Sequence, residues 1–372
     1  MKNKTNVDRY NFNNHFKPKE LEDLSKEFLN ILTNGNYILS DSVKEFEQEF
    51  SQFHNTNYCV GCNSGTDALI LALMALKIGL GDEVIVPANT FHATVLAVSR
   101  VGAKPILVDV NSDSFLMTDQ SIENAITSKT KAVLIVHLYG ASCEMESILQ
   151  LCNKKNIFLI EDCAQAHGAK YNDKLVGTFG QIGCFSFHPS KNLPAIGDAG
   201  ACITDIKELA ESMSIFRHLG QKTQNEHVIL GMNSRLDTIQ AVILKRRLAK
   251  LNDWNKKRRE IANRYIFEFQ NLPFTFQVIP SHSEHVYHLF QIKTAQRDQL
   301  LHYLISKGID AVIRYPYPIH LQESFAYLNY QIEDFPISED LAKNLLCLPL
   351  HPYLTEKQFL WVVSCVKDFF ST

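Results

Sequence analysis

Short apolar segments alternate with longer amphipathic segments between residues 57 and 205, and this alternation predicts the fold. Runs rich in β-branched residues predict strands at 57–60, 83–86, 105–108, 132–137, 157–161, 183–187 and 201–204. Segments with helical periodicity lie between most of them, at 66–77, 94–101, 121–125 and 145–154. Strands that are apolar throughout and separated by helices are typical of a mainly parallel sheet buried on both faces. We therefore predict an α/β fold with a seven-stranded sheet between helices and ligands at the carboxyl ends of its strands.

The pattern changes after residue 205. Residues 234–269 predict one long helix, and shorter elements beyond Pro273 predict a smaller α+β domain. A chain of 372 residues exceeds what one hydrophobic core usually organises. We expect a segment at 1–40 that packs on the smaller domain, a large domain at 41–245 and a small C-terminal domain at 246–372, entered by the long helix.

Composition and charge exclude several classes of protein. The formal net charge is −3, so no global field attracts the chain to nucleic acid or to an anionic membrane. The chain begins with polar residues and has no apolar run long enough to span a bilayer. Its nine cysteines are scattered, which suits reduced thiols in the cytoplasm. Cys59 and Cys62 form a C-x-x-C without a second pair, so no metal site is expected.

The segment G-C-N-S-G-T-D-A, from Gly61 to Ala68, lies between a predicted strand and a predicted helix. Its Ser and Thr side chains suit the cap of the helix, and its glycines let the backbone approach a ligand closely. Free N–H groups at a helix start bind phosphate. An ordinary helix cap and a phosphate site both fit this segment.

A second segment ends the strand at 157–161 and reads E-D-C-A-Q-A-H-G. The strand delivers Asp162 to its carboxyl end, where a carboxylate pairs with a protonated ring nitrogen or caps a helix. Gln165 follows three residues later and reaches the same region. For His167 we favour a structural, hydrogen-bonded role.

The third segment, F-S-F-H-P-S-K-N-L, places Lys191 just past an apolar strand. An uncharged lysine amine condenses with an aldehyde, and partial burial favours that uncharged form. Most lysines are only solvated, so this residue alone decides nothing. A phosphate loop, a strand-end Asp and a post-strand Lys in this order on one sheet are together unlikely to be a coincidence.

From about Tyr37 to near its end, the chain resembles the DegT/StrS-type sugar aminotransferases, which are pyridoxal-phosphate enzymes of fold type I. The segments that carry the resemblance are N-S-G-T-D-A-L, P-A-N-T-F, V-D-V, H-L-Y-G, E-D-C-A-Q-A-H-G-A, F-S-F-H-P-S-K-N-L, G-D-A-G-A and N-S-R-L-D. The resemblance implies that Lys191 holds the cofactor as a Schiff base and moves protons to the sugar carbon. It also implies that Asp162 keeps the pyridine nitrogen protonated, Gln165 contacts the ring hydroxyl and Phe91 stacks on the ring.

The same resemblance assigns the cofactor phosphate to Gly65, Thr66 and Ser186. Asn233 is expected to reach the phosphate of a neighbouring subunit's cofactor, which implies a homodimer with shared active sites. The amino donor in the family is usually glutamate, and the acceptor is a keto sugar linked to a nucleotide. Cell-surface polysaccharide, such as the O-antigen of lipopolysaccharide, and glycosylated secondary metabolites are both compatible destinations of the product.

Within the family, some members aminate C3 of the hexose and others aminate C4. The stretches K-N-L-x-x-x-G-D-A-G-A, N-S-R-L-D-x-x-Q-A, E-H-V-Y-H-L-F and Y-P-x-P-x-H-L-Q resemble the group that aminates C3 of dTDP-linked 3-keto-6-deoxyhexoses. The C4 alternative stays open, but its usual Thr-x-Gly-Glu-Gly-Gly after the lysine is missing. The resemblance places His188, Arg314 and Tyr315 beside the substrate.

Three positions depart from the family pattern: His188 for a common tyrosine, Pro194 for a common glycine and Arg314 for a frequent histidine. A guanidinium is permanently charged and suits bidentate contacts with anions, so Arg314 meets either a sugar-linked phosphate or a structural ion pair.

Three other functions are less well supported. Relatives that dehydrate the sugar carry histidine in place of the Schiff-base lysine, and here Lys191 is present. A non-catalytic relative would tolerate the loss of Lys191 or Asp162, and both are intact. A nicotinamide-dependent Rossmann enzyme would carry G-x-G-x-x-G after the first strand, which this chain lacks.

Overall fold

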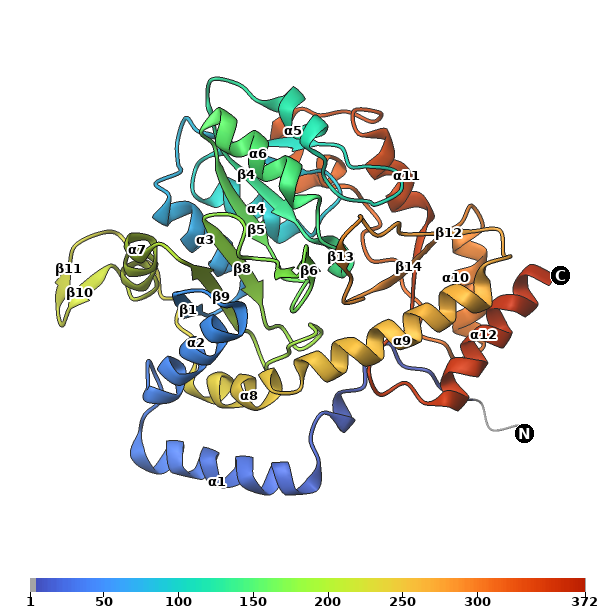
Figure 1. Cartoon of the computed structure of the whole chain (residues 1–372), viewed down its shortest axis with the longest axis horizontal. Coiled ribbons are helices and arrows are strands. Elements are labelled where there is room, and N and C mark those ends of the chain that lie inside the picture. The colour runs from blue at the N-terminus through green and yellow to red at the C-terminus, as the bar shows by residue number, and fades with distance from the viewer. Residues whose placement is uncertain (1–4, 372) are drawn as a thin grey trace.

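A seven-stranded sheet forms the centre of the larger part of the molecule (Figure 1). The computed structural model describes residues 5–371, so residues 1–4 of the predicted N-terminal segment lie outside the described residues. The strands of the sheet, in spatial order, are β1 (Tyr58–Cys62), β9 (Gly200–Thr204), β8 (Ile182–Ser186), β5 (Phe158–Asp162), β4 (Thr130–Val136), β2 (Glu83–Pro87) and β3 (Lys104–Val108). β9 is antiparallel to both its neighbours, whereas the pairs from β8 to β3 are parallel. The prediction of a mainly parallel seven-stranded sheet is confirmed.

Helices cover both faces of the sheet because its strands are apolar on both sides. On β8 and β9, Cys184 and Cys202 face α3 in one core, while Phe185 and Ile203 face α2 and α8 in another. Around the sheet lie α2 (Asp41–His54), α3 (Gly65–Ala75), α4 (His92–Arg100), α5 (Asp119–Ala125), α6 (Met145–Lys155) and α7 (Lys207–Arg217). Shorter elements of this part are η2 (Leu138–Gly140), β6 (Lys170–Tyr171), β7 (Lys174–Leu175), β10 (Gln221–Thr223) and β11 (Glu226–His227).

The prediction of one long helix at 234–269 is wrong. Two helices occupy this region, α8 (Thr238–Leu248) and α9 (Leu251–Phe269), and Lys250 between them has φ −101° and ψ −9°. α8 packs on the sheet of the large domain through Ala241 and Leu244, whereas α9 packs in the C-terminal core. Neither Gly nor Pro marks the break, so local sequence gives no signal for a bend that packing against two different cores imposes.

The C-terminal part has its own core, centred on Tyr265, Phe269, Ile292 and Val362. Its antiparallel sheet has the order β12 (Thr275–Phe276), β14 (Phe290–Lys293) and β15 (Leu345–Leu348). Its other elements are β13 (Ser283–Glu284), α10 (Arg297–Ser306), η3 (Ile319–Leu321), η4 (Glu323–Leu328), α11 (Pro336–Asn344) and α12 (Glu356–Ser371). This agrees with the predicted smaller α+β region, except that Ile319 of η3, Phe325 of η4 and Leu341 of α11 pack in the core of the large domain.

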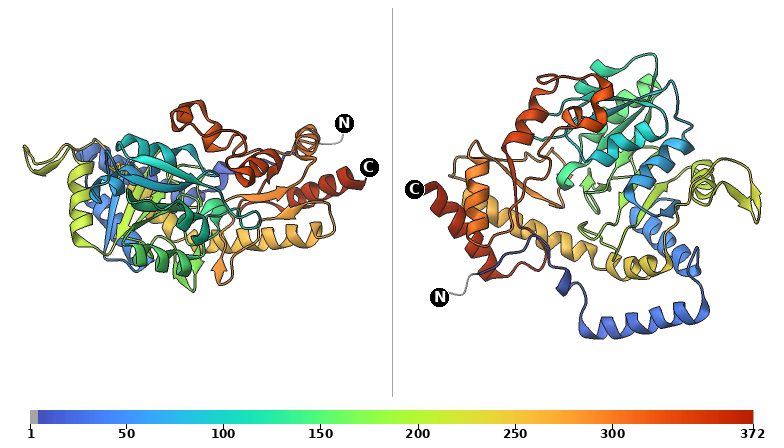
Figure 2. Two further views of the ribbon diagram at one scale, coloured as in Figure 1. Left: turned by 90° about the horizontal axis from the view of Figure 1, so that it is seen from above. Right: turned by 180° about the vertical axis from the view of Figure 1, so that it is seen from behind.

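The N-terminal segment divides its contacts between the two parts. Val7 forms a parallel bridge with Ile309 of the C-terminal part, and η1 (Phe12–Asn14) follows. α1 (Pro18–Asn34) instead packs on α8, a helix of the large domain, through Leu24 and Ile31. Figure 2 shows α1 lying apart from the C-terminal part. The expectation that residues 1–40 all pack on the small domain therefore needs correction for α1.

Within residues 5–371, none of the helices combines the length and the apolar character that crossing a bilayer requires.

Candidate active site

A cavity of about 380 Å³ opens at the carboxyl ends of β5 and β8, where the C-terminal part meets the sheet. All the predicted site residues except Asn233 line it: Gly65, Thr66, Phe91, Asp162, Gln165, Ser186, His188, Lys191, Arg314 and Tyr315. Asn233 is exposed and forms a bridge with His218, outside the residues that line the cavity. The structure thus brings together residues that are up to 250 positions apart in the chain, from Gly65 to Tyr315.

The start of α3 forms one wall of the cavity. Ser64 caps the helix by accepting a hydrogen bond from the Asp67 backbone N–H at 3.1 Å. Gly65 lies so close to β8 that a Cβ atom there would stand 2.5 Å from the Cβ of Ser186, which only glycine avoids. The first N–H groups of a helix have no partner within the helix, so this end attracts an anion into the cavity. The cap and the anion site are compatible features of one helix start.

Asp162 ends β5 at the floor of the cavity and is buried. Its Oδ2 accepts a hydrogen bond from the Thr94 hydroxyl at 2.8 Å, and its Oδ1 accepts one from the Ala164 N–H at 3.1 Å. Burial raises the pKa of Asp162, while these two donors and the charge of Lys191 oppose that rise. A buried carboxylate with so few donors gains from a cationic partner, because a positive charge restores its ionised form. Sequence reasoning missed Thr94, although it lies just after the P-A-N-T-F segment.

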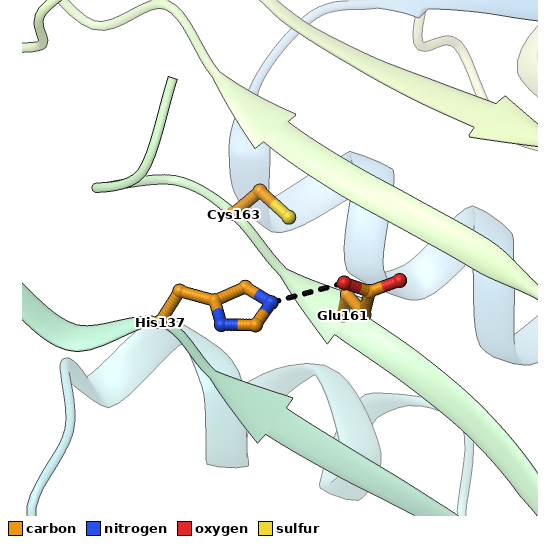
Figure 3. A group of neighbouring side chains, drawn as sticks. All are labelled: His137, Glu161 and Cys163. Carbon is orange, nitrogen blue, oxygen red and sulfur yellow. Dashed lines mark hydrogen bonds and ion pairs between the residues drawn. The ribbon is translucent and has the colours of Figure 1, made fainter. Parts of the chain in front are cut away.

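Glu161, the residue before Asp162, points to the other face of the sheet and belongs to a closed cluster (Figure 3). Its oxygens accept hydrogen bonds from the N–H groups of Gly177, Phe179 and Gly180, each at 2.7 Å. His137 donates to Glu161 from Nε2 at 3.0 Å, and its Nδ1 accepts from the N–H of Cys143 at 3.1 Å.

Cys163 completes the set of side chains in Figure 3, whose ligand atoms lie within 4.8 Å of one another. Burial raises the pKa of the Cys163 thiol well above its ordinary value, and metal binding needs the thiolate. Because the hydrogen-bonding atoms of His137 and Glu161 are already engaged, this cluster is a structural unit of the sheet.

Gln165 is held in a fixed orientation above the floor. Its Oε1 accepts from the Tyr139 N–H at 2.8 Å, and its Nε2 donates to the Tyr315 hydroxyl at 2.6 Å. The ring of Tyr315 stacks near that of Tyr139, with centroids 6.0 Å apart, and lies 6.5 Å from that of Phe91. Phe91 itself is 55% exposed and caps the start of α4 with its backbone. The cavity therefore has an aromatic side that suits a flat ring.

Lys191 follows β8 on a short loop, and its N–H donates to the carbonyl of His188 at 2.8 Å. Burial lowers the pKa of Lys191 to about 8, Asp162 opposes this shift and the charge of Arg314 adds to it. About a tenth of the amine is therefore uncharged at pH 7, and condensation with an aldehyde requires this uncharged form.

The polar groups beneath this loop were not given roles in the sequence analysis. Asn192 donates to the Val286 carbonyl and to Asn255 Oδ1, both at 3.0 Å, and its Oδ1 lies 3.2 Å from His288 Nδ1. His288 lines the cavity, and its place in the E-H-V-Y-H-L-F segment was the only signal for it. His167, predicted to be structural and hydrogen-bonded, is packed against Phe185 and Phe187, and burial lowers its pKa to about 3. Neither of its ring nitrogens has a hydrogen-bond partner among the described residues, so the hydrogen-bonded part of that prediction is not confirmed.

This arrangement fits pyridoxal phosphate. The start of α3 offers a phosphate site, Asp162 offers a carboxylate to a ring nitrogen, and Lys191 offers an amine of lowered pKa to an aldehyde. When bound, this cofactor supplies an electron sink for reactions at carbon atoms that carry amino groups. Fold and site together define the class of pyridoxal-phosphate enzymes with the aminotransferase fold.

Residues 18–367 match the DegT/DnrJ/EryC1/StrS aminotransferase family, and the chain belongs to this family. It is 42% identical, over 94% of its length and 95% of the relative's, to a dTDP-3-amino-3,6-dideoxy-alpha-D-galactopyranose transaminase of Aneurinibacillus thermoaerophilus. It is 43% identical, over 95% of both chains, to a UDP-N-acetyl-3-dehydro-alpha-D-glucosamine 3-aminotransferase of Acidithiobacillus ferrooxidans. The crystal structure of DesV from S. venezuelae in complex with a ketimine intermediate superposes with a TM-score of 0.93 at 38% identity, covering 95% of this chain and 96% of that one. The chain is a pyridoxal-phosphate-dependent sugar aminotransferase.

Proposed function

We propose that this enzyme aminates C3 of a dTDP-linked 3-keto-6-deoxyhexose, with glutamate as the amino donor. The observation that carries the proposal is the likeness to two transaminases whose names both place the new amino group at C3 of a nucleotide sugar. Their nucleotides differ, and the choice of dTDP rests on the 3,6-dideoxyhexose product of the first. The chain also has the four segments that resemble the C3 group. We place the reaction in the cytoplasm, because all nine cysteines of the chain are free thiols.

The proposed roles of the cavity residues are those that the resemblance implies, and the place of these residues in one cavity supports them. Gly65 and Thr66, at the start of α3, bind the cofactor phosphate together with Ser186 at the end of β8. Asp162 holds a proton on the ring nitrogen, because a protonated ring withdraws electrons more strongly. Gln165 donates or accepts at the ring hydroxyl, and Phe91 covers one face of the ring.

Lys191 is the residue that accepts and delivers protons during the reaction. It lines the same cavity as Asp162 and Arg314, whose opposite charges act on the pKa of its amine. It removes a proton from the carbon of the amino donor and delivers one to the sugar carbon in the second half of the reaction. His188 and Tyr315 line the route to this carbon and contact the sugar.

We assign Asn233 to the cofactor phosphate of a second subunit. It is exposed and lies next to the β10–β11 hairpin, which projects from the large domain in Figures 1 and 2. A homodimer in which this hairpin reaches the neighbouring cavity gives Asn233 a function that it lacks within one chain. Light scattering of the purified protein tests the dimer, and a monomer with full activity contradicts it.

The regiochemistry is tested by following the label from glutamate that is isotopically labelled in its amino group. The purified protein, loaded with pyridoxal phosphate, receives this donor and the dTDP-3-keto sugar. Nuclear magnetic resonance that finds the label on C3 of the product supports the proposal. If the label appears on C4 of a matched dTDP-4-keto sugar and none is transferred to the 3-keto sugar, the enzyme belongs to the group that aminates C4. No transfer to either sugar contradicts the assignment of the substrate class.

A further inference from the structure

Arg314 presents a positive charge to the cavity without a negative partner of its own. Its hydrogen bond goes to the hydroxyl of Tyr10 and not to a carboxylate. Among residues 5–371, no carboxylate oxygen lies within 4.0 Å of its guanidinium, whereas Arg9, in the same region, pairs with Asp310 at 3.6 Å. A half-buried cation that faces a cavity is costly unless an anion neutralises it. The missing anion is therefore expected to come with a ligand.

Arg314 acts close to the reacting amine. It lines the same cavity as Lys191, and its charge adds to the effect of burial on that amine. The phosphate of the cofactor is already provided for by the start of the helix α3 and by Ser186 at the end of β8, both in the large domain rather than in the C-terminal part. The anion that Arg314 meets must therefore belong to one of the two substrates.

The two substrates differ in the distance between their anionic group and the carbon atom that reacts. In an amino acid donor, the carboxylate is bonded to the same carbon that carries the transferred amino group. In a nucleotide sugar, the phosphate is attached through C1 and lies several bonds away from C3. An anion held beside Lys191 thus fits the carboxylate of the donor better than the diphosphate of the sugar. A planar guanidinium binds a carboxylate through two parallel hydrogen bonds.

We propose that Arg314 binds the α-carboxylate of the amino donor, and that Tyr10 is the residue that positions its guanidinium. This inference rests on the proposed transfer from an α-amino acid, and it adds a residue of the N-terminal segment to the active site.

Tyr10 is well placed for this role. The bridge between Val7 and Ile309 holds the N-terminal segment against the C-terminal part, and the ring of Tyr10 stacks on that of Phe12 with centroids 5.5 Å apart. Tyr10 and Phe12 also line a small cavity with Ser190 and Lys191, so the segment touches the catalytic loop from behind. This part of the N-terminal segment thereby reaches a site built by residues far away in the sequence.

The test separates the two half-reactions of the enzyme loaded with its cofactor. Glutamate is mixed with the pyridoxal-phosphate form, and the keto sugar is mixed with the pyridoxamine-phosphate form, each followed by absorbance in a single turnover. In Arg314→Gln, the glutamate concentration for half-maximal rate is expected to rise roughly 30-fold, because a bidentate charge-assisted contact is lost. The sugar half-reaction stays within about twofold of the wild type. Arg314→Lys recovers part of the loss.

Tyr10→Phe removes only the hydroxyl and tests positioning. We expect about a fivefold rise in the same glutamate concentration, without a change in the limiting rate. Arg264→Gln, at an exposed pair with Glu356, is the matched control and leaves both half-reactions unchanged. Calorimetry with glutarate, a dicarboxylate that does not react, gives a readout apart from turnover. Glutarate binding to the loaded protein weakens at least about tenfold in Arg314→Gln.

Unchanged use of glutamate and unchanged glutarate binding in Arg314→Gln overturn the inference. So does a selective loss of the sugar half-reaction, which would place the anion on the nucleotide sugar. If Arg314→Gln fails to fold, as seen by circular dichroism, Tyr10→Phe carries the test. A wild-type protein that reacts with glutamate but with no keto sugar contradicts the proposed function, and the glutamate arm still decides the role of Arg314.

Discussion

Two carboxylates side by side at the end of β5 have opposite environments. Glu161 accepts hydrogen bonds from three backbone N–H groups and from His137, all supplied by the chain. Asp162, on the opposite face of the strand, accepts from Thr94 and Ala164 and otherwise faces the cavity. Alternate residues of a strand point to opposite faces, so one strand end serves both a structural cluster and a ligand site.

The pKa values of the two groups move in opposite directions. Burial raises the pKa of both, but for Glu161 the hydrogen bonds and His137 outweigh burial and the net pKa is lowered. For Asp162 burial prevails and the pKa is raised. A buried carboxylate whose hydrogen-bond partners all come from the chain stabilises the fold. A buried carboxylate with few hydrogen-bond partners is available to a cationic ligand.

Asp162→Asn has the largest expected effect on activity. Without the carboxylate, the ring nitrogen loses its proton, and we expect the transamination rate to fall by about 10³-fold. The free energy of unfolding of the cofactor-free protein should stay the same or increase, because the substitution removes a poorly solvated buried charge. Steady-state rates and denaturant unfolding measure the two effects. A large loss of stability with normal activity per folded molecule would reverse the roles assigned to the pair.

Glu161→Gln is expected to change the stability of the protein and not its activity. It leaves backbone N–H groups facing an amide that cannot accept from all of them, so we expect a loss of about 3 kcal/mol in the free energy of unfolding at neutral pH. The activity of the molecules that remain folded is unchanged.

The pH dependence checks the cause of this loss. Since the folded pKa of Glu161 is lowered, its contribution is complete above the unfolded value of 4.5 and disappears as the pH falls through the folded value. The difference in the free energy of unfolding between wild type and Glu161→Gln therefore becomes smaller as the pH falls. A gap that stays constant from neutral pH to well below pH 4.5 contradicts this account.

The pH dependence of cofactor uptake tests the environment of Lys191, which lines the same cavity as Asp162. Because the pKa of Lys191 is lowered to about 8, the rate at which pyridoxal phosphate produces its visible band should rise with pH and level off above that value. In Arg314→Gln the midpoint moves to higher pH, since a cation that disfavours the charged amine is removed. A midpoint near the ordinary lysine value of 10.5 in the wild type would show that burial of Lys191 has little effect.

Thr94→Val has the smallest expected effect. It removes one of the two donors to Asp162 and nothing from Glu161. We expect cofactor affinity to fall by about tenfold, with a rise in the pKa of Asp162. Thr90→Val is the matched control, because its hydroxyl reaches Asp162 only through Thr94, at 3.0 Å. Equal effects of the two substitutions would contradict a direct role for Thr94.

The sheet and most of the cavity were predictable from sequence because each depends on local pattern. Apolar runs identify buried strands, and Asp162 follows one of those runs directly while Lys191 lies on the short loop after another. The break at Lys250 was not predictable, since no residue there disfavours a helix and only packing on two cores divides α8 from α9. The cluster of Glu161 and the contact of Tyr10 with Arg314 join residues that are distant in the chain, so only the folded structure reveals them.

The central claim is that Lys191 binds the cofactor and transfers the amino group. The most direct test is the visible spectrum of the protein with pyridoxal phosphate, recorded before and after glutamate and then after the dTDP-3-keto-6-deoxyhexose. We predict a band that glutamate bleaches and the keto sugar restores, that is missing in Lys191→Ala and present in the exposed control Lys174→Ala. A band of full strength in Lys191→Ala, bleached and restored as in the wild type, would contradict the account.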